Sequence, residues 1–337
     1  MPPRSRVTIR DVAAQAGVSV ATVSKVLNQR YGVSADTFAR VTAVIKELGY
    51  EASLVAQSLR NHRTNVIGIL VADIEPFSTE LLKGAADAIR GTGFELVVYS
   101  AGGRTSDPHG WEHRYLTRLS GTLVDGAVLV TPAVDLEGIP GTPVVAVDPH
   151  TGRAALPTVD SDNLHGGRLA TEHLLELGHR RIALLTGRED LKSAQQRETG
   201  FRGALAAAGL VVDENLVRRG DYDADVAAAS TRELLTGPDR PTAIFAANDI
   251  TAIAAIQAAR ELGLRVPEDL SVVGFDNIPE SALCTPPLTT VEQPIREMGH
   301  RAVELLVRLI NGAEPADTHI TLGTELVIRQ STRPLTP

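Results

Sequence analysis

Residues 8 to 28 constrain the fold of this chain most, because their pattern fits two short helices joined by a sharp turn. Thr8 and Ser19 stand where the helices would begin, and a short hydroxyl there can accept a hydrogen bond from a free backbone N–H. Gly17 lies between them and can adopt the backbone angles that a sharp turn requires. Apolar residues recur at helical spacing on both sides of the glycine: Ile9, Val12, Ala13, Ala16, Val18, Val23, Val26 and Leu27. The stretch predicts a helix-turn-helix unit.

A third helix, expected from residue 34 to residue 48, would complete a small three-helix head. Val41, Val44, Ile45 and Leu48 can close its core. Residues 1–63 contain nine Arg and Lys but four Asp and Glu, a net charge of +5; the whole chain carries −8, so the remainder carries −13. A basic head on an acidic body confines the attraction for phosphate to the head. A helical hairpin with a merely solvated polar face is the alternative, but charge and the third helix favour DNA binding.

The head resembles the DNA-reading domain of the lactose/galactose repressor (LacI/GalR) family of bacterial transcription regulators. The similarity is carried by V-T-I-R-D-V-A-A-Q-A-G-V-S-V-A-T-V-S-K-V-L-N, then by V-S-A-D-T and E-L-G-Y, and it continues through nearly the whole chain. It implies that Val20, Ala21 and Thr22 approach base edges in the major groove. Lys25 stands where many members have Arg, so it would make one contact to guanine instead of two. The full DNA-contacting set that we expect in the head is Thr8, Ser19, Val20, Ala21, Thr22, Ser24, Lys25 and Asn28.

The same resemblance implies that residues 53–63 form a hinge helix when two heads sit on operator DNA. Ser53 would cap it, Ala56 would let two hinge helices approach, and Leu59 would wedge between base pairs in the minor groove. Such a wedge unstacks a base step and bends the duplex, which adds specificity. The family usually has Pro and Asn where this chain has Ala52 and Ser53, so the start of the hinge should be less rigid. A plain amphipathic linker is the alternative.

From residue 65 onward, short β-rich apolar runs alternate with helical patterns, as buried parallel strands and their crossover helices require. We expect strands at 66–71, 95–99, 127–130, 144–147, 181–185, 216–218, 243–246, 271–275 and 325–329. Helices are expected near 78–90, 110–119, 165–177, 194–208, 224–235, 250–262 and 296–310. Two such sets predict a two-lobed α/β core with doubly wound parallel sheets, like the periplasmic binding proteins.

The expected organisation is therefore a helix-turn-helix domain, a hinge and a core. The DNA-binding domain would cover 1–52, the hinge 53–63 and the core 64–337. Within the core, the N-lobe would take about 64–161 and 292–323, and the C-lobe about 162–291 and 324–337. No heptad helix that could make a tetramer follows the core, so we expect a homodimer.

Ligands in such folds bind at the carboxyl ends of the strands, in the cleft between lobes. Polar or aromatic residues stand at those ends: Asp73, Phe77, Asp148, Arg197, Tyr222, Asn248, Asp249, Asp276 and Gln293. By resemblance, all of them except Asp73 and Asp249 align with effector-contacting positions of the family. An aromatic ring, several acids and an arginine opening a helix suit a neutral mono- or oligosaccharide, whereas the carboxylates would repel an anionic ligand. Asn248 and Asp249 could instead cap a helix, and Asp276 could anchor a loop.

Patterns typical of other function classes are missing. No G-x-G-x-x-G follows the first strand, His109 and His113 have no third metal ligand beside them, and Cys284 is the single cysteine. No apolar run is long enough to span a membrane, and the N-terminus lacks a secretion signal. We expect a cytoplasmic protein with no enzyme activity, cofactor, metal or membrane partner. The hypothesis is a repressor released from operator DNA by a sugar; a sugar-binding module without regulation and a regulator with a co-repressor are the alternatives.

Overall fold

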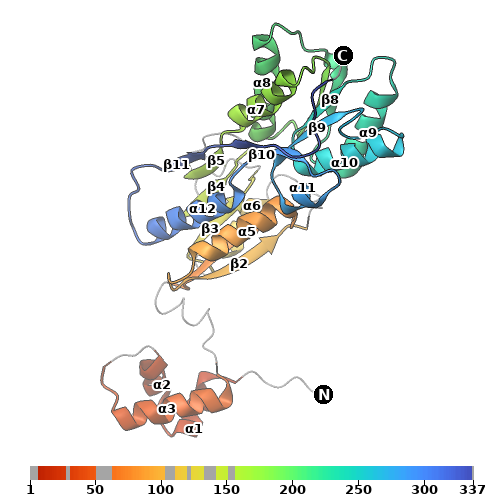
Figure 1. Ribbon diagram of the computed structural model, residues 1–337. Helices are drawn as coiled ribbons and strands as arrows, with labels where there is room; N and C mark the ends of the chain where they lie inside the picture. The colour runs from red at the N-terminus through yellow and green to blue at the C-terminus, as the bar shows by residue number, and fades with distance from the viewer. Residues whose placement is uncertain are drawn as a thin grey trace. The chain divides into compact units, whose positions relative to one another are not determined.

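The computed structural model describes residues 7–27, 31–50, 63–102, 111–119, 123–132, 142–150 and 156–335 (Figure 1). The chain divides into two compact units, Met1–Thr64 and Asn65–Pro337. Asn28, and the hinge residues Ser53, Ala56 and Leu59, lie outside the described residues, so their roles stay predictions. No helix within the described ranges has the length and apolar character needed to cross a bilayer.

The first unit is the expected three-helix head, made of α1 (Ile9–Ala16), α2 (Val20–Leu27) and α3 (Ala35–Leu48). Thr8 and Asp11 form a capping box at the start of α1, where the Asp11 carboxylate accepts from the Thr8 N–H at 2.8 Å. Gly17 ends α1 in the left-handed region, with φ of 64°. The predicted apolar face is confirmed: α1, α2 and α3 bury a cluster that consists of Val12, Ala13, Ala16, Val23, Val26, Val41 and Val44.

The N-lobe of the second unit is built on a six-stranded parallel sheet in the order β11-β5-β4-β3-β1-β2. Its strands are β1 (Val66–Val71), β2 (Glu95–Ser100), β3 (Gly126–Val130), β4 (Val144–Val147), β5 (Thr158–Ser161) and β11 (His319–Leu322). The sheet is accompanied by α5 (Pro76–Ala88), α6 (Trp111–Leu119) and α12 (Ile295–Ile310). The strands β1, β3 and β4 are buried throughout, as predicted. The prediction of a buried strand was wrong for β2, which is half-exposed because it lies at the sheet edge.

The C-lobe has a second six-stranded sheet in the order β12-β10-β9-β8-β6-β7, parallel except for the β10–β12 pair. Its strands are β6 (Ile182–Thr186), β7 (Val217–Arg219), β8 (Ala243–Ala246), β9 (Ser271–Asp276), β10 (Thr289–Glu292) and β12 (Glu325–Val327). Its helices are α7 (Asn163–Glu176), α8 (Lys192–Ala207), α9 (Ala224–Thr236), α10 (Asp249–Glu261) and α11 (Pro279–Leu283), with a 3₁₀ turn at Glu214–Leu216. The two-lobed core with two mainly parallel sheets is confirmed.

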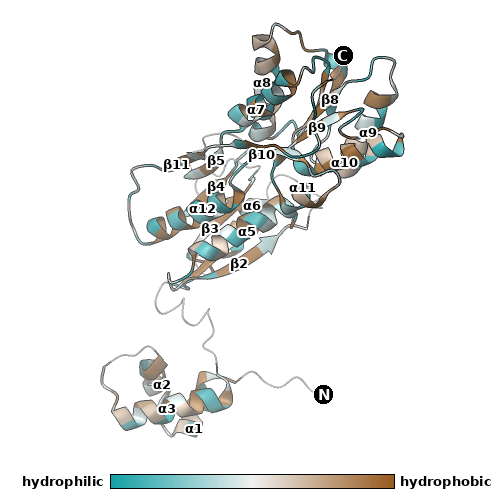
Figure 2. Ribbon diagram, viewed as in Figure 1, coloured by the Kyte–Doolittle hydropathy of each residue, from teal (hydrophilic) through white to brown (hydrophobic). Residues whose placement is uncertain are grey.

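Three segments of the chain cross between the lobes. They adjoin the strands β5, β10 and β11, which the sequence analysis did not predict. The chain passes from β5 in the N-lobe to α7, returns from β10 to α12, and crosses again from β11 to β12. The helix α12 then buries its apolar side against the N-lobe sheet (Figure 2). We call the stretches at 161–163, 292–295 and 322–325 the first, second and third crossover.

Glycines bring one pair of helices in each lobe into backbone contact. A Cβ added at Gly84 of α5 would lie 1.8 Å from the Arg296 carbonyl oxygen of α12. In the C-lobe, a Cβ added at Gly167 of α7 would lie 2.2 Å from the Arg197 carbonyl oxygen of α8, and one at Gly200 would meet the backbone of α7 at 2.3 Å. Only glycine permits these approaches, so each glycine contact fixes the distance between its two helices.

Candidate functional site

The outer surface of α2 carries the predicted DNA-reading residues. Ser19, Val20, Ala21 and Lys25 are exposed, and Thr22 is half-exposed. The Ser19 hydroxyl accepts from the Thr22 N–H at 3.1 Å, as expected of a residue that caps a helix. Thr8 is exposed and Ser24 is half-exposed. The exposed positions of α2 therefore form one short polar and apolar surface at the start of a helix, which is the geometry that a major groove accepts.

Arg197 is the centre of the candidate effector site in the core. Its side chain is 4% exposed and lies inside α8, which begins at Lys192; the prediction that Arg197 opens the helix was wrong because the helix starts five residues earlier. The guanidinium stacks on the Phe275 ring at 3.7 Å. It donates from Nε to Asn163 at 2.8 Å and from Nη1 to the Ala247 carbonyl at 2.6 Å. These contacts lock its position while one edge remains near the acidic residues of the site.

Asp276 and Gln293 lie directly beside this arginine. Asp276 Oδ1 accepts from Arg197 Nη1 at 3.3 Å and from Gln293 Nε2 at 2.6 Å. Burial raises the pKa of Asp276 to about 7, while the charge of Arg197 acts in the opposite direction. Near neutral pH this carboxyl can therefore be either a hydrogen-bond acceptor or a donor.

Asp148 and Tyr222 complete the group around the guanidinium. Burial raises the pKa of Asp148, and the charge of Arg197 and the hydroxyl of Ser193 oppose that rise. The Tyr222 ring lies 5.8 Å from the guanidinium. Burial raises the pKa of Tyr222 to about 12, and the nearby Ser193 side chain opposes that rise. The Tyr222 hydroxyl nevertheless forms no hydrogen bond of regular geometry. The structure thus brings Asp148, Arg197, Tyr222, Asp276 and Gln293 together.

Three members of this group have unusual backbone conformations. Asp148, Tyr222 and Asp276 have φ angles of 48°, 60° and 112° at the ends of three different strands. Left-handed backbone costs free energy in residues other than glycine and clusters at functional sites. These three residues thus share a positive φ angle, which the sequence analysis did not predict.

The remaining predicted contacts lie differently. Asn248 is the N-cap of α10 and accepts from the Thr251 N–H at 3.0 Å. Asp249 is fully buried, and its two oxygens accept from the Thr290 hydroxyl and the Ile278 N–H. Asn248 therefore has the capping role that was its alternative in the sequence analysis, whereas Asp249 does not cap the helix but bonds to β10 and to the residue before α11. An effector contact from either residue stays a prediction.

Asp73 follows β1, and Phe77 is the second residue of α5. Asp73 is exposed and accepts from its neighbouring backbone N–H at 2.8 Å. Phe77 is half-buried and packs against the N-lobe core at the start of α5. Within the described residues, no hydrogen bond, ion pair or ring contact joins either of them to Arg197, so their part in the site stays a prediction.

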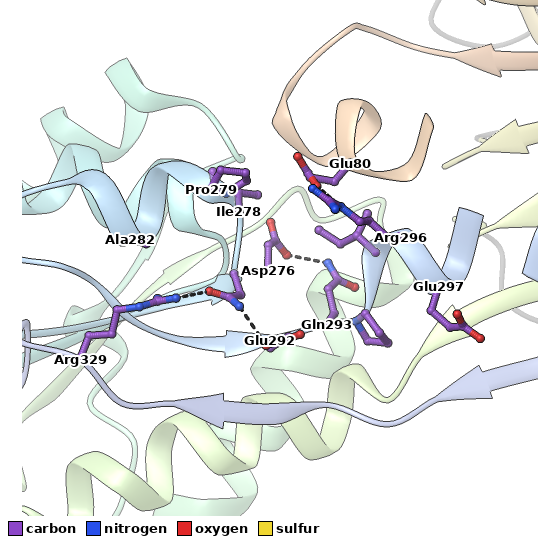
Figure 3. A pocket seen from close by; sticks show the side chains of 13 residues that line it. Glu80, Asp276, Ile278, Pro279, Ala282, Glu292, Gln293, Arg296, Glu297 and Arg329 are labelled. Carbon is purple, nitrogen blue, oxygen red and sulfur yellow. Dashed lines mark hydrogen bonds and ion pairs between the residues drawn. The ribbon is translucent and has the colours of Figure 1, made fainter. Parts of the chain in front are cut away.

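A cavity of about 530 Å³ opens beside Asp276 and Gln293, between elements of both lobes. Figure 3 shows the Asp276–Gln293 hydrogen bond and, across the cavity, the pair that Arg296 of α12 makes with Glu80 of α5 at 2.6 Å. Its volume lies within the range of small-molecule sites. The carboxylates that line it outnumber the arginines, so its character is acidic.

Sequence reasoning missed two buried residues that support the site, Asn163 and Ser161. Asn163 accepts from Arg197, and the Ser161 hydroxyl donates to Gln293 Oε1 at 2.8 Å. Asn163 is the first residue of α7, and Ser161 is the last residue of β5. A polar residue at a chain crossover was the available signal, but β5 itself was not predicted.

Comparisons with known proteins place both units in one family. Residues 8–53 match the model described as bacterial regulatory proteins, lacI family, and residues 171–332 match a periplasmic binding protein-like domain. The chain is 38% identical to the HTH-type transcriptional regulator CelR of Thermobifida fusca, covering 98% of this chain and 100% of that protein. It is 39% identical to the ribose operon repressor of Halalkalibacterium halodurans, covering 97% of each.

Solved structures agree with this assignment. The Lac repressor dimer bound to operator and the anti-inducer ONPF has a TM-score of 0.83 at 31% identity, covering 98% of this chain and 100% of that one. A complex of CelR with cellobiose has a TM-score of 0.70 at 37% identity, covering 97% and 100%. The resemblance stated from the sequence is confirmed. The chain belongs to the lacI family of bacterial regulatory proteins, and it is a DNA-binding transcriptional regulator.

Proposed function

We propose that this chain represses sugar-utilisation genes as a cytoplasmic homodimer and leaves its operator when a neutral mono- or oligosaccharide binds the core. The observation that carries the proposal is a buried group in which Arg197 of α8 lies among Asp148, Asp276 and Gln293, which stand at the ends of strands from both lobes. Sugar hydroxyls both donate and accept hydrogen bonds, and this group offers both kinds of partner. Two relatives support a sugar: one solved as a complex with cellobiose, and one named for ribose.

Charge favours a neutral ligand over a sugar phosphate. Arg197 already pairs with Asp276 and donates to two uncharged partners. Burial is the main cause of the raised pKa of Asp276, and the negative charges of Glu75 and Asp148 add to it. An anionic ligand would meet these carboxylates without an unpaired buried cation to offset them.

On the DNA side, two heads of a dimer would read a pseudo-palindromic operator. Val20, Ala21 and Thr22 would face base edges, Lys25 would donate to guanine, and Thr8, Ser24 and Asn28 would hold phosphates. Ser53, Ala56 and Leu59 would form the hinge contacts in the minor groove. The similarity to the solved Lac repressor dimer bound to operator supports a dimer that binds operator DNA.

Release requires the sugar to prefer one of two arrangements of the lobes. A ligand changes an equilibrium only by its difference in affinity for the two states. By the same linkage, operator DNA must weaken sugar binding by the factor by which sugar weakens operator binding. No catalytic step is needed for this action, so we propose a regulator and not an enzyme.

Fluorescence anisotropy tests the proposal directly. A labelled duplex from the region upstream of the gene is titrated with the full chain, then challenged with cellobiose, ribose and other neutral sugars, and with sugar phosphates as the charged comparison. We expect release by a neutral sugar. Release by a sugar phosphate alone would contradict the acidic site, and tightening by a sugar would establish a co-repressor. Leu59→Ala should weaken operator binding and leave sugar affinity unchanged; equal operator affinity would refute the hinge assignment.

A further inference from the structure

A closed ring of buried hydrogen bonds joins the effector-facing residues to the crossovers. Arg197 Nε donates to Asn163, whose Nδ2 donates to the Ser161 carbonyl at 3.1 Å. The Ser161 hydroxyl donates to Gln293, and Gln293 donates to Asp276. Asp276 closes the ring by accepting from Arg197. We call these five residues the crossover ring; each of them is at most 6% exposed.

The ring spans two crossovers and borders the third. Ser161 and Asn163 belong to the first crossover, and Gln293 belongs to the second. In the third, the Thr324 hydroxyl donates to the Asp162 carbonyl at 3.1 Å, and Leu322 accepts from the Asp162 N–H at 2.8 Å. The first crossover is therefore hydrogen-bonded to both of the others.

A change in the angle between the lobes must twist these crossovers. The ring resists that change because its atoms are buried, and each broken bond leaves a polar group without water or partner. The glycine contact at Gly167 adds to the resistance, since it fixes the backbone of Arg197 against α7, the helix that Asn163 begins. Arg197 and Asn163 therefore move together, and Gln293 and Asp276 must re-pair when the second crossover turns.

We propose that Ser161 and Asn163 are positioning residues that make the lobe angle depend on the pairing of Arg197, Asp276 and Gln293. A ligand hydroxyl that takes over one of the two hydrogen bonds that Asp276 accepts, from Arg197 or from Gln293, opens the ring at its effector side and releases the crossovers at the other side. The proposal rests on the proposed function, because it assigns the regulation of that same site. Beyond the proposed function, it names the crossover residues Ser161 and Asn163 as the connection between the effector site and the lobe angle.

Pulsed electron paramagnetic resonance on the full chain measures the lobe angle without any ligand. Spin labels are attached through Val211→Cys in the C-lobe and Glu314→Cys in the N-lobe, both exposed positions, with Cys284→Ser removing the native thiol. Labelled chains are diluted into unlabelled ones so that only distances within one chain contribute. We expect Ser161→Ala to widen the distance distribution about twofold, since the ring then loses its bond between crossovers. Gln293→Met, a similar shape on the other crossover, should widen it equally.

Ser331→Ala is the matched control. The Ser331 hydroxyl is fully buried, donates to the Val272 carbonyl at 2.6 Å and accepts from the Thr289 N–H at 2.8 Å, but lies outside the ring. It should lower the melting temperature and leave the distance distribution unchanged. An unchanged distribution in Ser161→Ala, or equal widening in Ser331→Ala, would overturn the proposal. If no sugar moves the distribution of the unaltered protein, the proposed function fails separately, because the ring is judged on the ligand-free result.

Discussion

Replacing Tyr222 by Phe should stabilise the ligand-free protein. Among the described residues, the Tyr222 hydroxyl is the one buried side-chain polar atom without a hydrogen-bond partner. An unpaired buried polar group costs about 1–3 kcal/mol, and Phe retains the ring while removing that group. The ring itself should stay in place, because it packs beside Arg197 and against Gly187, where an added Cβ would lie 2.3 Å from it.

The expected gain is about 1 kcal/mol, the low end of that range, because the nearby Ser193 side chain offsets part of the cost of the buried hydroxyl. For a unit of this size, that corresponds to a rise in melting temperature of about 2–4 °C. Differential scanning calorimetry of the full chain without sugar measures it. Tyr115→Phe is the control. The Tyr115 ring packs near Tyr99 and Trp111, and its hydroxyl is not a buried group without a partner, so this substitution should not raise the melting temperature. A fall in melting temperature for Tyr222→Phe would show that the hydroxyl has a partner and would refute the reasoning.

Two further changes test the burial of Asp276 and the helix contact in the N-lobe. Burial raises the pKa of Asp276 to about 7, so the folded state holds an extra proton between about pH 4 and 7 and its stability falls as pH rises through that window. Asp276→Asn should remove this part of the pH slope in urea unfolding; an unchanged slope would contradict the assignment. Gly84→Ala should cost about 3 kcal/mol because its Cβ would lie 1.8 Å from the Arg296 carbonyl. Gly203→Ala, where an added Cβ on α8 meets open space, should instead stabilise the protein by about 1 kcal/mol in the same denaturation assay. If both substitutions lowered the stability equally, the backbone contact at Gly84 could not be the cause of the loss.

The head was predictable because its signals are local. A hydroxyl at each helix start, a glycine at the turn and apolar residues at helical spacing all lie within a few residues of what they specify. The structure places Gly17 in the left-handed conformation and Ser19 as a cap, as the pattern required. Ser34 likewise accepts from the Thr37 N–H at the start of α3.

The core was predictable where strands are buried on both faces and therefore continuously apolar. That rule found β1, β3, β4 and β8 to within a residue. It failed for β5 (T-V-D-S), β10 (T-T-V-E) and β11 (H-I-T-L), whose sequences mix polar residues with apolar ones. These strands lead into crossovers, where polar side chains bond to other crossovers instead of packing in a core.

The site was predictable in its residue types but not in its connections. Arg197, Asp276 and Gln293 were expected at strand ends, and the structure brings them into hydrogen-bond contact. Ser161 and Asn163 escaped notice because their partners lie 132 and 34 residues away along the chain. Such pairings depend on sheet order, which a local pattern does not specify.

The glycine contact between α7 and α8 separates positions of the core that do not tolerate substitution from positions that do. Gly167 and Gly200 hold the two helices at a fixed distance. The position of the Arg197 backbone relative to α7 is therefore fixed as well. Tyr222 sits on a strand-end loop and Phe77 at the first turn of α5, outside that contact. Directed evolution toward new inducers should therefore accumulate substitutions at Tyr222 and Phe77 while leaving the glycines alone. A biosensor library built on this chain would be best diversified at those two aromatic positions.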